Sequence, residues 1–264
     1  MGKLSGKTAF ITGAAMGLAE GIASVYAKYG AQLVLADISP RVDEVAKRLS
    51  EAYGSEIITV HLDVSDPEAC KEAAKAGIAR FGKYDILCAI AGVCRLGNFL
   101  EMSDADRDFH IDVNIKGVWN TTRAVLPYLL ENKGGNIVVM SSVTGDIVAD
   151  PGETAYALSK AALVGFTKAL AVEFAQQNIR VNAMQLGYAR TPMAESIAVQ
   201  SNPDDPESVL VDMAKAIPMK RLGRPEEVGE LAAFLGSDES SYITGSQFVI
   251  DGGSTLPESV TVGV

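Results

Sequence analysis

Short apolar runs and longer amphipathic segments alternate along most of the chain. The first apolar run, residues 8–11, is bounded by polar residues and predicts a buried parallel strand. Residues 17–29 follow with their apolar positions on one helical face, and Gly30 is a residue type that commonly ends a helix. The same two patterns predict further strands at 32–36, 57–60, 84–89, 136–140, 179–183 and 247–250, and further helices at 40–53, from 67 onward, and at 103–130, 156–176 and 225–235.

This regular alternation predicts an α/β fold, a single Rossmann-type, doubly wound sheet of seven parallel strands with helices on both faces. No linker-like stretch divides the sequence, so residues 1–264 are interpreted as one domain. Such sheets bind ligands beyond the carboxyl ends of their strands, near the point where strand order reverses. Residues 192–223 are rich in proline and break the alternation. We predict that they form an insertion over this edge, a substrate lid within the domain.

The charge and cysteine content narrow the classes of partner. The net charge of −10 would repel nucleic acid and anionic membranes, so neither is an expected partner. The three cysteines, Cys70, Cys88 and Cys94, contain no Cys-x-x-Cys pair and fit a reducing compartment. No apolar signal region or uninterrupted apolar run of roughly 20 residues is visible, so a cytoplasmic location is expected. His61 and His110 lie far apart in sequence, and no metal site is predicted.

A glycine-rich segment, residues 12–19, joins the first predicted strand to the first predicted helix. Glycines at such a turn let the backbone approach a pyrophosphate, whose charge is stabilised at the helix N-terminus. We therefore predict that Gly13, Met16, Gly17 and Leu18 bind a dinucleotide. A purely structural turn is the alternative interpretation.

Asp37 ends the second predicted strand. A carboxylate at this position accepts hydrogen bonds from both ribose hydroxyls and repels a 2′-phosphate, so it predicts NAD as the cofactor and makes NADP the less favoured alternative. Asp37 could instead cap the following helix, a role that Ser39 could also fill. Arg41 is the one nearby cation that would favour NADP.

Tyr156 and Lys160 are four positions apart and therefore share one face of a predicted helix. A free phenol has a pKa of about 10, too high to accept a proton at neutral pH. An ammonium and a positively charged nicotinamide ring both favour the phenolate, so we expect the pKa of Tyr156 to be lowered. Tyr156 is thus predicted to be the general base in oxidation and the general acid in reduction, while Lys160 bonds the nicotinamide ribose.

Two further residues complete the predicted catalytic group. Ser142 follows the fifth predicted strand, and its hydroxyl is expected to bind the substrate oxygen beside Tyr156. Asn114, in the long helix before that strand, is predicted to anchor a water that continues a proton relay from Lys160. Each residue alone has an ordinary structural interpretation, as a capping serine, a packed tyrosine, a surface lysine or a helical asparagine. Their combination with the glycine-rich turn favours the catalytic one.

Taken together, these residues resemble the short-chain dehydrogenase/reductase family over almost the whole chain. The matching segments are 12–17, Asp63-Val64, Ala91-Gly92, Asn114, Ser142, Tyr156 with Lys160, Gly187 with Thr191, and 251–253. The resemblance implies a seven-stranded parallel Rossmann sheet, an NAD(P)-dependent enzyme acting on CH–OH groups, and a homotetramer. It also implies that Asp63 and Val64 contact the adenine, that Ala91 lines the cofactor cleft, and that Ala189 and Thr191 hold the nicotinamide carboxamide.

Residues 141–146, 150–156 and 190–196 are also similar to one bacterial subgroup of the family, the UcpA-type oxidoreductases. Three positions depart from the usual family pattern. Ala19 replaces the third glycine of the turn, Ala89-Ile90 replaces an Asn-Asn pair, and Leu186 replaces a proline. The missing amides imply a rearranged hydrogen-bond network in the cleft, and Leu186 implies a less restrained backbone.

The predicted chemistry requires a secondary alcohol or its ketone as the substrate. Arg95, Asp146, Asp150 and Glu153 would make the substrate pocket polar and suited to a sugar, polyol or hydroxy acid. The apolar side chains of Met193, Ile197 and Met213 would instead suit a steroid or aliphatic ketone. An NADP-dependent ketone or steroid reductase is therefore one alternative, and a non-catalytic dinucleotide-binding regulator is another of a different class.

Overall fold

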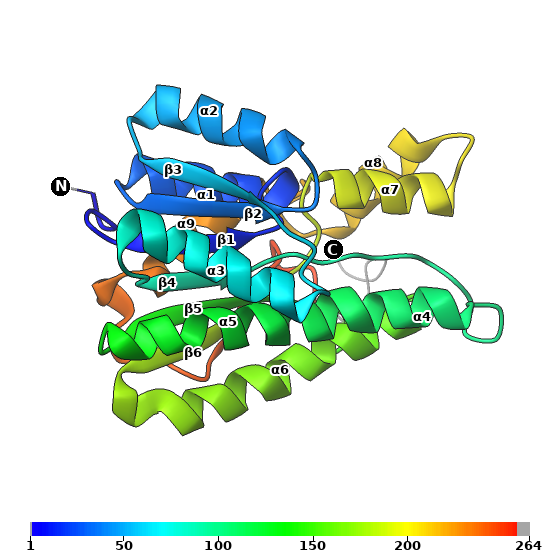
Figure 1. The fold of residues 1–264 in the computed structure, drawn as a ribbon. Helices are drawn as coiled ribbons and strands as arrows, with labels where there is room; N and C mark the ends of the chain where they lie inside the picture. The colour runs from blue at the N-terminus through cyan, green and yellow to red at the C-terminus, as the bar shows by residue number, and fades with distance from the viewer. Residues whose placement is uncertain (1, 258–264) are drawn as a thin grey trace.

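The computed structural model describes residues 2–257, which contain one seven-stranded, wholly parallel sheet (Figure 1). The strand order is β3-β2-β1-β4-β5-β6-β7, so the order reverses between β1 and β4. The predicted fold class is confirmed. The strands are β1 (Thr8–Thr12), β2 (Gln32–Asp37), β3 (Ile57–His61), β4 (Ile86–Ala89), β5 (Gly135–Ser142), β6 (Ile179–Leu186) and β7 (Gln247–Ile250).

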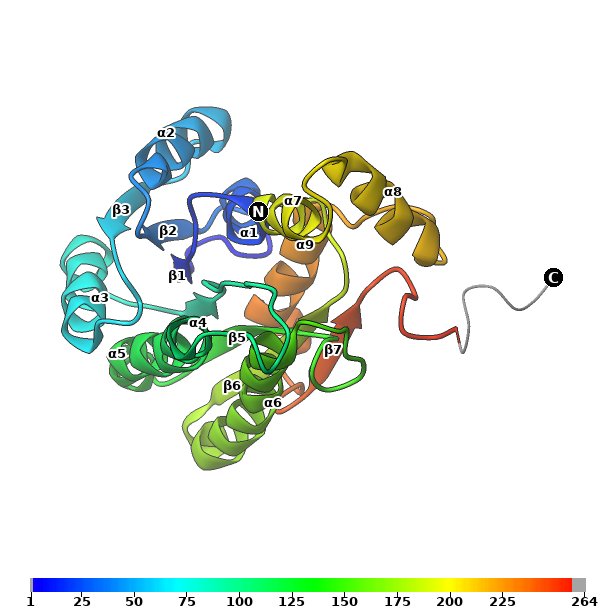
Figure 2. The same ribbon diagram turned by 90° about the vertical axis from the view of Figure 1, so that its right-hand side faces the viewer.

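Helices cover both faces of the sheet, as the side view shows (Figure 2). One face carries α1 (Gly17–Lys28), α2 (Arg41–Tyr53) and α9 (Pro225–Gly236), and the other carries α3 (Pro67–Phe81), α5 (Gly117–Glu131) and α6 (Thr154–Phe174). Side chains alternate along a strand, so β1 places Ile11 in the core under α1 and Phe10 in the core under α3 and α5. Both are fully buried, as a central parallel strand requires.

Capping residues explain where a helix begins, and a glycine explains how closely two helices pack. Asp66 accepts hydrogen bonds from the amides of Glu68 and Ala69, and Pro67 starts α3, as the sequence predicts. In α1, a Cβ on Gly21 would lie 2.4 Å from Pro225, so glycine allows α1 and α9 to pack closely. Short 3₁₀ turns, Ala175–Gln177 and Asp238–Ser240, follow α6 and α9.

The long helix predicted over residues 103–130 is divided into three parts. It begins as α4 (Asp104–His110), continues as a π-helical turn (Ile111–Lys116) and becomes α5. The widened turn contains Asn114, which is fully buried. Such turns occur frequently at functional sites.

The proline-rich segment between β6 and α9 contains two helices that the sequence pattern did not predict. They are α7 (Pro192–Ser201) and α8 (Pro206–Ala216), each with proline in its first turn. Proline lacks an N–H but tolerates this position, so it marks helix starts here and does not indicate an irregular loop. Ala194, Ala198 and Leu210 form a small core between the two helices.

Several element boundaries also differ from the prediction. Strand β4 begins at Ile86, two residues later than predicted, and β5 continues to Ser142, which was expected to follow it. Strand β6 continues beyond residue 183 to Leu186, because it pairs with β5 on one side and β7 on the other. Helix α6 begins at Thr154, two residues earlier than predicted.

One helical stretch among the described residues, Thr154–Gln177, has the length and mean hydropathy of a membrane span. This stretch is α6 with its 3₁₀ extension, and in the structure it packs against β5 and β6.

Candidate active site

A cleft of about 1380 Å³ opens beyond the carboxyl ends of β1, β2, β4, β5 and β6. It lies at the edge where strand order reverses, the place expected for a ligand of this fold. Helices α7 and α8 contribute to one of its walls. The cleft brings together Gly13, Met16, Gly17, Leu18, Asp37, Asp63, Val64, Ala91, Ser142, Tyr156, Lys160, Ala189 and Thr191, which are the predicted site residues other than Asn114.

Close packing at one end of the cleft requires glycine in the turn between β1 and α1. Gly13 has a φ of 73°, and a Cβ there would lie 2.9 Å from the Cα of Ala91. Gly17 has a φ of 62° at the start of α1. The preceding residue, Met16, makes no side-chain capping bond, so the first amides of α1 have no side-chain cap from it. Ala19 is buried within the α1 core, which accommodates its methyl group.

Asp37 joins the glycine-rich turn to the segment that precedes the second helix. Its Oδ2 accepts a hydrogen bond of 2.9 Å from the amide of Ala15, and its Oδ1 accepts one of 2.8 Å from the amide of Ser39. Asp37 does not cap α2, since Ser39 accepts from the Arg41 amide at 3.3 Å, and the Asp37 carboxylate lines the cleft. Arg41 is exposed and is not among the residues that line the cleft.

The backbone at the Ala89-Ile90 departure is bonded by a threonine at the end of β1. The hydroxyl oxygen of Thr12 accepts hydrogen bonds from the amides of Ile90 and Ala91, at 3.0 and 3.1 Å. The Ile90 side chain is buried in the apolar core, so this position needs no amide side chain. The neighbouring wall is formed by Asp63, whose Oδ1 accepts from both Ser65 donors, and by the buried Val64.

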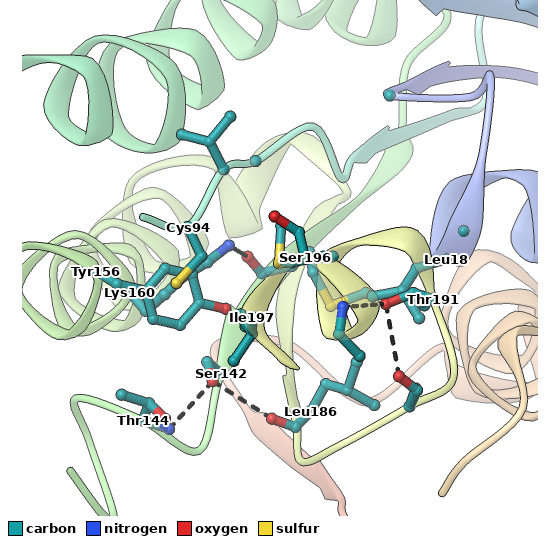
Figure 3. Close-up of a pocket in the computed structure, with 18 of the residues that line it drawn as sticks. Leu18, Cys94, Ser142, Thr144, Tyr156, Lys160, Leu186, Thr191, Ser196 and Ile197 are labelled. Carbon is teal, nitrogen blue, oxygen red and sulfur yellow. Dashed lines mark hydrogen bonds between the residues drawn. The ribbon is translucent and has the colours of Figure 1, made fainter. Parts of the chain in front are cut away.

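Ser142, Tyr156 and Lys160 lie at the opposite end of the cleft from the glycine-rich turn (Figure 3). Ser142 is the last residue of β5, and its hydroxyl accepts from the Thr144 amide at 3.1 Å and donates to the Leu186 carbonyl at 3.4 Å. Lys160 donates to the Met140 carbonyl at 2.9 Å, and its Nζ is 5.6 Å from the centroid of the Tyr156 ring.

The predicted lowering of the Tyr156 pKa is wrong for the protein alone. Burial raises the pKa of Tyr156, and the neighbouring Cys94 thiol raises it further, whereas the hydrogen bond with Ser142 lowers it. Burial also lowers the pKa of Lys160 to about 8. Both groups lie in a desolvated environment that disfavours their charged forms. In the protein alone, burial has the larger effect on the pKa of Tyr156.

Asn114 is not among the residues that line the cleft, and its side chain joins two segments beside it. Its Oδ1 accepts from the Val93 amide at 2.8 Å, while its Nδ2 donates to the Val93 carbonyl at 3.0 Å and to the Ser159 hydroxyl at 2.9 Å. The amide thus ties the loop after β4 to α6 and positions both. The predicted role of Asn114 in a proton relay from Lys160 stays a prediction.

Several residues at the substrate end differ from their predicted surroundings. Arg95 lines the cleft but pairs with Asp106 at 2.5 Å and stacks on Phe109, with its Cζ 4.1 Å from the ring centroid. Asp146 is absent from the lining and instead accepts a hydrogen bond from Gln185. Asp150, Glu153, Met193, Ile197 and Met213 do line the cleft.

Sequence reasoning missed two groups that organise the cleft, Thr12 and Gln200. Thr12 follows the apolar run of the first strand, where a hydroxyl is the only available signal. Gln200 in α7 accepts a hydrogen bond of 2.9 Å from the Leu96 amide, across the cleft opening. No local pattern indicates that contact, because the two residues lie on segments distant in sequence.

The fold and this cleft define a dinucleotide-type oxidoreductase site, and comparison with known proteins agrees. A family model described as enoyl-(acyl carrier protein) reductase matches residues 13–255. The chain is 66% identical over 264 residues to oxidoreductase UcpA of Escherichia coli K12, covering 100% of both chains. The protein belongs to the short-chain dehydrogenase/reductase family and is an oxidoreductase.

Two solved structures illustrate the likeness. L-sorbose reductase from Gluconobacter frateurii, complexed with NADPH and L-sorbose, has a TM-score of 0.90 and 32% identity, with coverage of 97% of this chain and 99% of that one. Carveol dehydrogenase from Mycobacterium avium, in complex with NAD, has a TM-score of 0.92 and 32% identity, with coverage of 97% and 100%. The two relatives therefore bind different nicotinamide dinucleotides.

Proposed function

We propose that this protein interconverts a secondary alcohol and its ketone by NAD(H)-dependent hydride transfer. One observation carries the proposal. Tyr156, Lys160 and Ser142 share a cleft with a glycine-rich helix start and the Asp37 carboxylate. The nicotinamide, when bound, supplies or accepts the hydride. A proton must then be moved at the substrate oxygen, and Tyr156 is the group we assign to that step.

The residues fit a dinucleotide at three points. The positive φ of Gly13 and its approach to Ala91 create a turn that any larger side chain would obstruct. The α1 N-terminus offers backbone amides to a pyrophosphate. Asp37 offers carboxylate oxygens to the ribose. We assign the adenine to Asp63 and Val64, and the nicotinamide carboxamide to Ala189 and Thr191.

At the reacting end, Tyr156 holds a proton at its phenol oxygen and donates it to a ketone during reduction. In oxidation the same oxygen takes the proton from the alcohol. Ser142, whose hydroxyl lies near the Tyr156 phenol and lowers its pKa, orients the substrate oxygen beside it. We also assign a nicotinamide ribose contact to Lys160. The pKa of its amine, about 8, keeps most of the group protonated at neutral pH.

We expect NAD to be preferred to NADP. Replacing Asp37 with Asn removes the charge that opposes a 2′-phosphate, so the ratio of kcat/KM for NAD to that for NADP should fall by at least about tenfold, equivalent to about 1.4 kcal/mol. Steady-state kinetics with both cofactors measures this ratio. Glu44→Gln, which removes an exposed charge from α2, is the matched control and should leave the ratio unchanged. A wild-type preference for NADP would refute the role of Asp37.

The general proposal is tested by following NAD reduction with sugars, polyols, hydroxy acids and sterols. Turnover of any secondary alcohol supports it. Binding of NADH without oxidation of any member favours the non-catalytic regulator. The altered Ala89-Ile90 motif is the sequence feature that favours that alternative. In the structure the backbone amides of Ile90 and Ala91 are nevertheless held by the Thr12 hydroxyl. An NADP-dependent ketone or steroid reductase remains the second candidate, favoured by the apolar Met193, Ile197 and Met213 in the cleft.

We also propose a homotetramer, supported by apolar side chains on the outer surfaces of α5 and α6. Trp119, Leu158 and Val172 are 55%, 56% and 82% exposed. Assembly would bury them. Val172→Glu should reduce the assembled mass measured by light scattering, whereas Glu173→Gln beside it should not. A monomeric wild type would contradict the proposal.

The burial of Cys70, Cys88 and Cys94 as free thiols supports a cytoplasmic location.

A further inference from the structure

Glu153 is a buried carboxylic acid that the proposed hydride transfer does not use. It lies immediately before α6, in the N-cap position, yet its side chain makes no capping hydrogen bond. The residue is only 6% exposed, and its Oε2 has no hydrogen-bond partner among the described residues. It lines the same cleft as Tyr156. A buried polar oxygen without a partner costs free energy, so a ligand group that bonds it would remove a real penalty.

The loop that carries Glu153 is held in place by backbone contacts. The Glu153 amide donates to the Asp150 carbonyl at 3.3 Å, and the Gly97 amide donates to the Gly152 carbonyl at 2.9 Å. Gly152 has a φ of 83°, a conformation in which glycine is favoured. The carboxyl is therefore positioned by a defined turn.

A second carboxylate and a phenol flank Glu153 in the cleft wall. Tyr188 donates its hydroxyl hydrogen to Asp150 Oδ2 at 3.0 Å. Burial raises the pKa of Glu153, the Asp150 charge raises it further, and the Thr144 hydroxyl lowers it. This end of the cleft thus presents oxygen acceptors and negative charge to any ligand that enters it.

Among the described residues, the cationic side chains that line the cleft are Arg95 and Lys160, and both contact other groups. Arg95 pairs with Asp106 and stacks on Phe109. Lys160 donates to the Met140 carbonyl. A substrate carboxylate placed here would meet like charges in a desolvated pocket, which is strongly unfavourable. A hydrogen-bond donor on the substrate would instead meet the Glu153 Oε2, an acceptor to which none of the described residues donates.

We propose that Glu153, with Asp150 and Tyr188 beside it, forms a substrate subsite that binds a hydroxyl or ammonium group and rejects a carboxylate. The inference rests on the proposed hydride transfer and narrows its substrate class. Polyols and amino alcohols fit the subsite, and hydroxy acids do not. Glu153 is then a specificity-determining residue, separate from the proton transfer at Tyr156.

The test compares ligands that differ at one group: 1,3-butanediol, 4-amino-2-butanol and 3-hydroxybutyrate. Dissociation constants are measured by ligand-observed NMR with and without NADH, and kcat/KM is measured for the same series. For the wild type we expect the diol or the amine to exceed the hydroxy acid by at least about tenfold in both measurements. Glu153→Gln keeps an acceptor but removes the charge, so this ratio should fall by about tenfold. Asp150→Asn should shift it less, in the same direction.

The controls separate the two proposals. Glu173→Gln removes an exposed charge from α6 and should keep the wild-type ratio. A larger loss for the amine than for the diol in Glu153→Gln identifies an ammonium group as the bound donor, and equal losses identify a hydroxyl. A ratio within twofold of wild type in a folded Glu153→Gln protein overturns the subsite, as does a wild-type preference for the hydroxy acid. Binding selectivity without turnover of any member would retain the subsite and reject the hydride transfer.

Discussion

Tyr156→Phe should lower kcat by about 10²- to 10⁴-fold, the usual contribution of a positioned general acid or base. The substitution deletes the phenol oxygen that we assign to proton transfer and keeps the ring that fills this part of the cleft. Binding of NADH should therefore change little. Steady-state turnover and NADH fluorescence titration measure the two effects separately.

A tyrosine outside the cleft provides the matched control for this loss. Tyr53 lies at the end of α2, is 44% exposed and shares a long hydrogen bond of 3.4 Å with Ser24. Tyr53→Phe also removes a phenol hydroxyl, but outside the cleft, and should leave kcat unchanged. Full activity in Tyr156→Phe would reject the assignment of proton transfer to Tyr156. Only the proposal that the cleft binds a dinucleotide would then remain.

Gly13→Val should weaken NADH binding by at least about a hundredfold, the second large effect expected. The new Cβ would lie 2.9 Å from the Ala91 Cα, and the backbone there has a φ of 73°. Because the obstructing atom belongs to the backbone of another segment, the turn must move away from the cleft. Fluorescence titration with NADH measures the loss.

The backbone strain of such a substitution is isolated at a second glycine. Gly54 has a φ of 70° and no atom within 4 Å of the place where its Cβ would lie. Gly54→Val should lower the melting temperature through the unfavourable left-handed conformation while NADH affinity is retained. If both variants lose NADH affinity equally, or if Gly13→Val binds normally, the close approach of the turn to Ala91 is not what shapes the cofactor site.

The departures from the family pattern could be seen in the sequence, but their consequences could not. Ile90 looked like the loss of a hydrogen-bonding side chain, and the structure shows it packed in the apolar core, with its backbone amide bonded to the Thr12 hydroxyl. Leu186 looked like a loosened backbone, and it is instead the paired last residue of β6. In each case the contacts come from other strands, which no local pattern can reveal.

Electrostatics was the other property that required tertiary structure. The spacing of Tyr156 and Lys160 correctly indicated a shared helix face, from which we expected the ammonium to lower the phenol pKa. In the protein alone burial has the larger effect and raises the pKa of Tyr156, because both side chains lie in a desolvated part of the cleft. Desolvation depends on all the atoms packed around a group, whereas the spacing of two residues in the sequence identifies only one neighbour.

The amino-acid sequence by itself determined the parallel sheet, the position of the glycine-rich turn and the set of side chains available for hydride and proton transfer. Periodicity reports which face of an element is buried, and the carboxyl ends of parallel strands must meet at one edge. Tertiary structure alone decided that Asn114 positions a loop, that α7 and α8 are helices over the cleft, and that the Glu153 oxygen is buried with no partner within residues 2–257. Those features depend on contacts between segments that are distant in the sequence. Such contacts, and their contributions to the free energy, exist only in the folded chain.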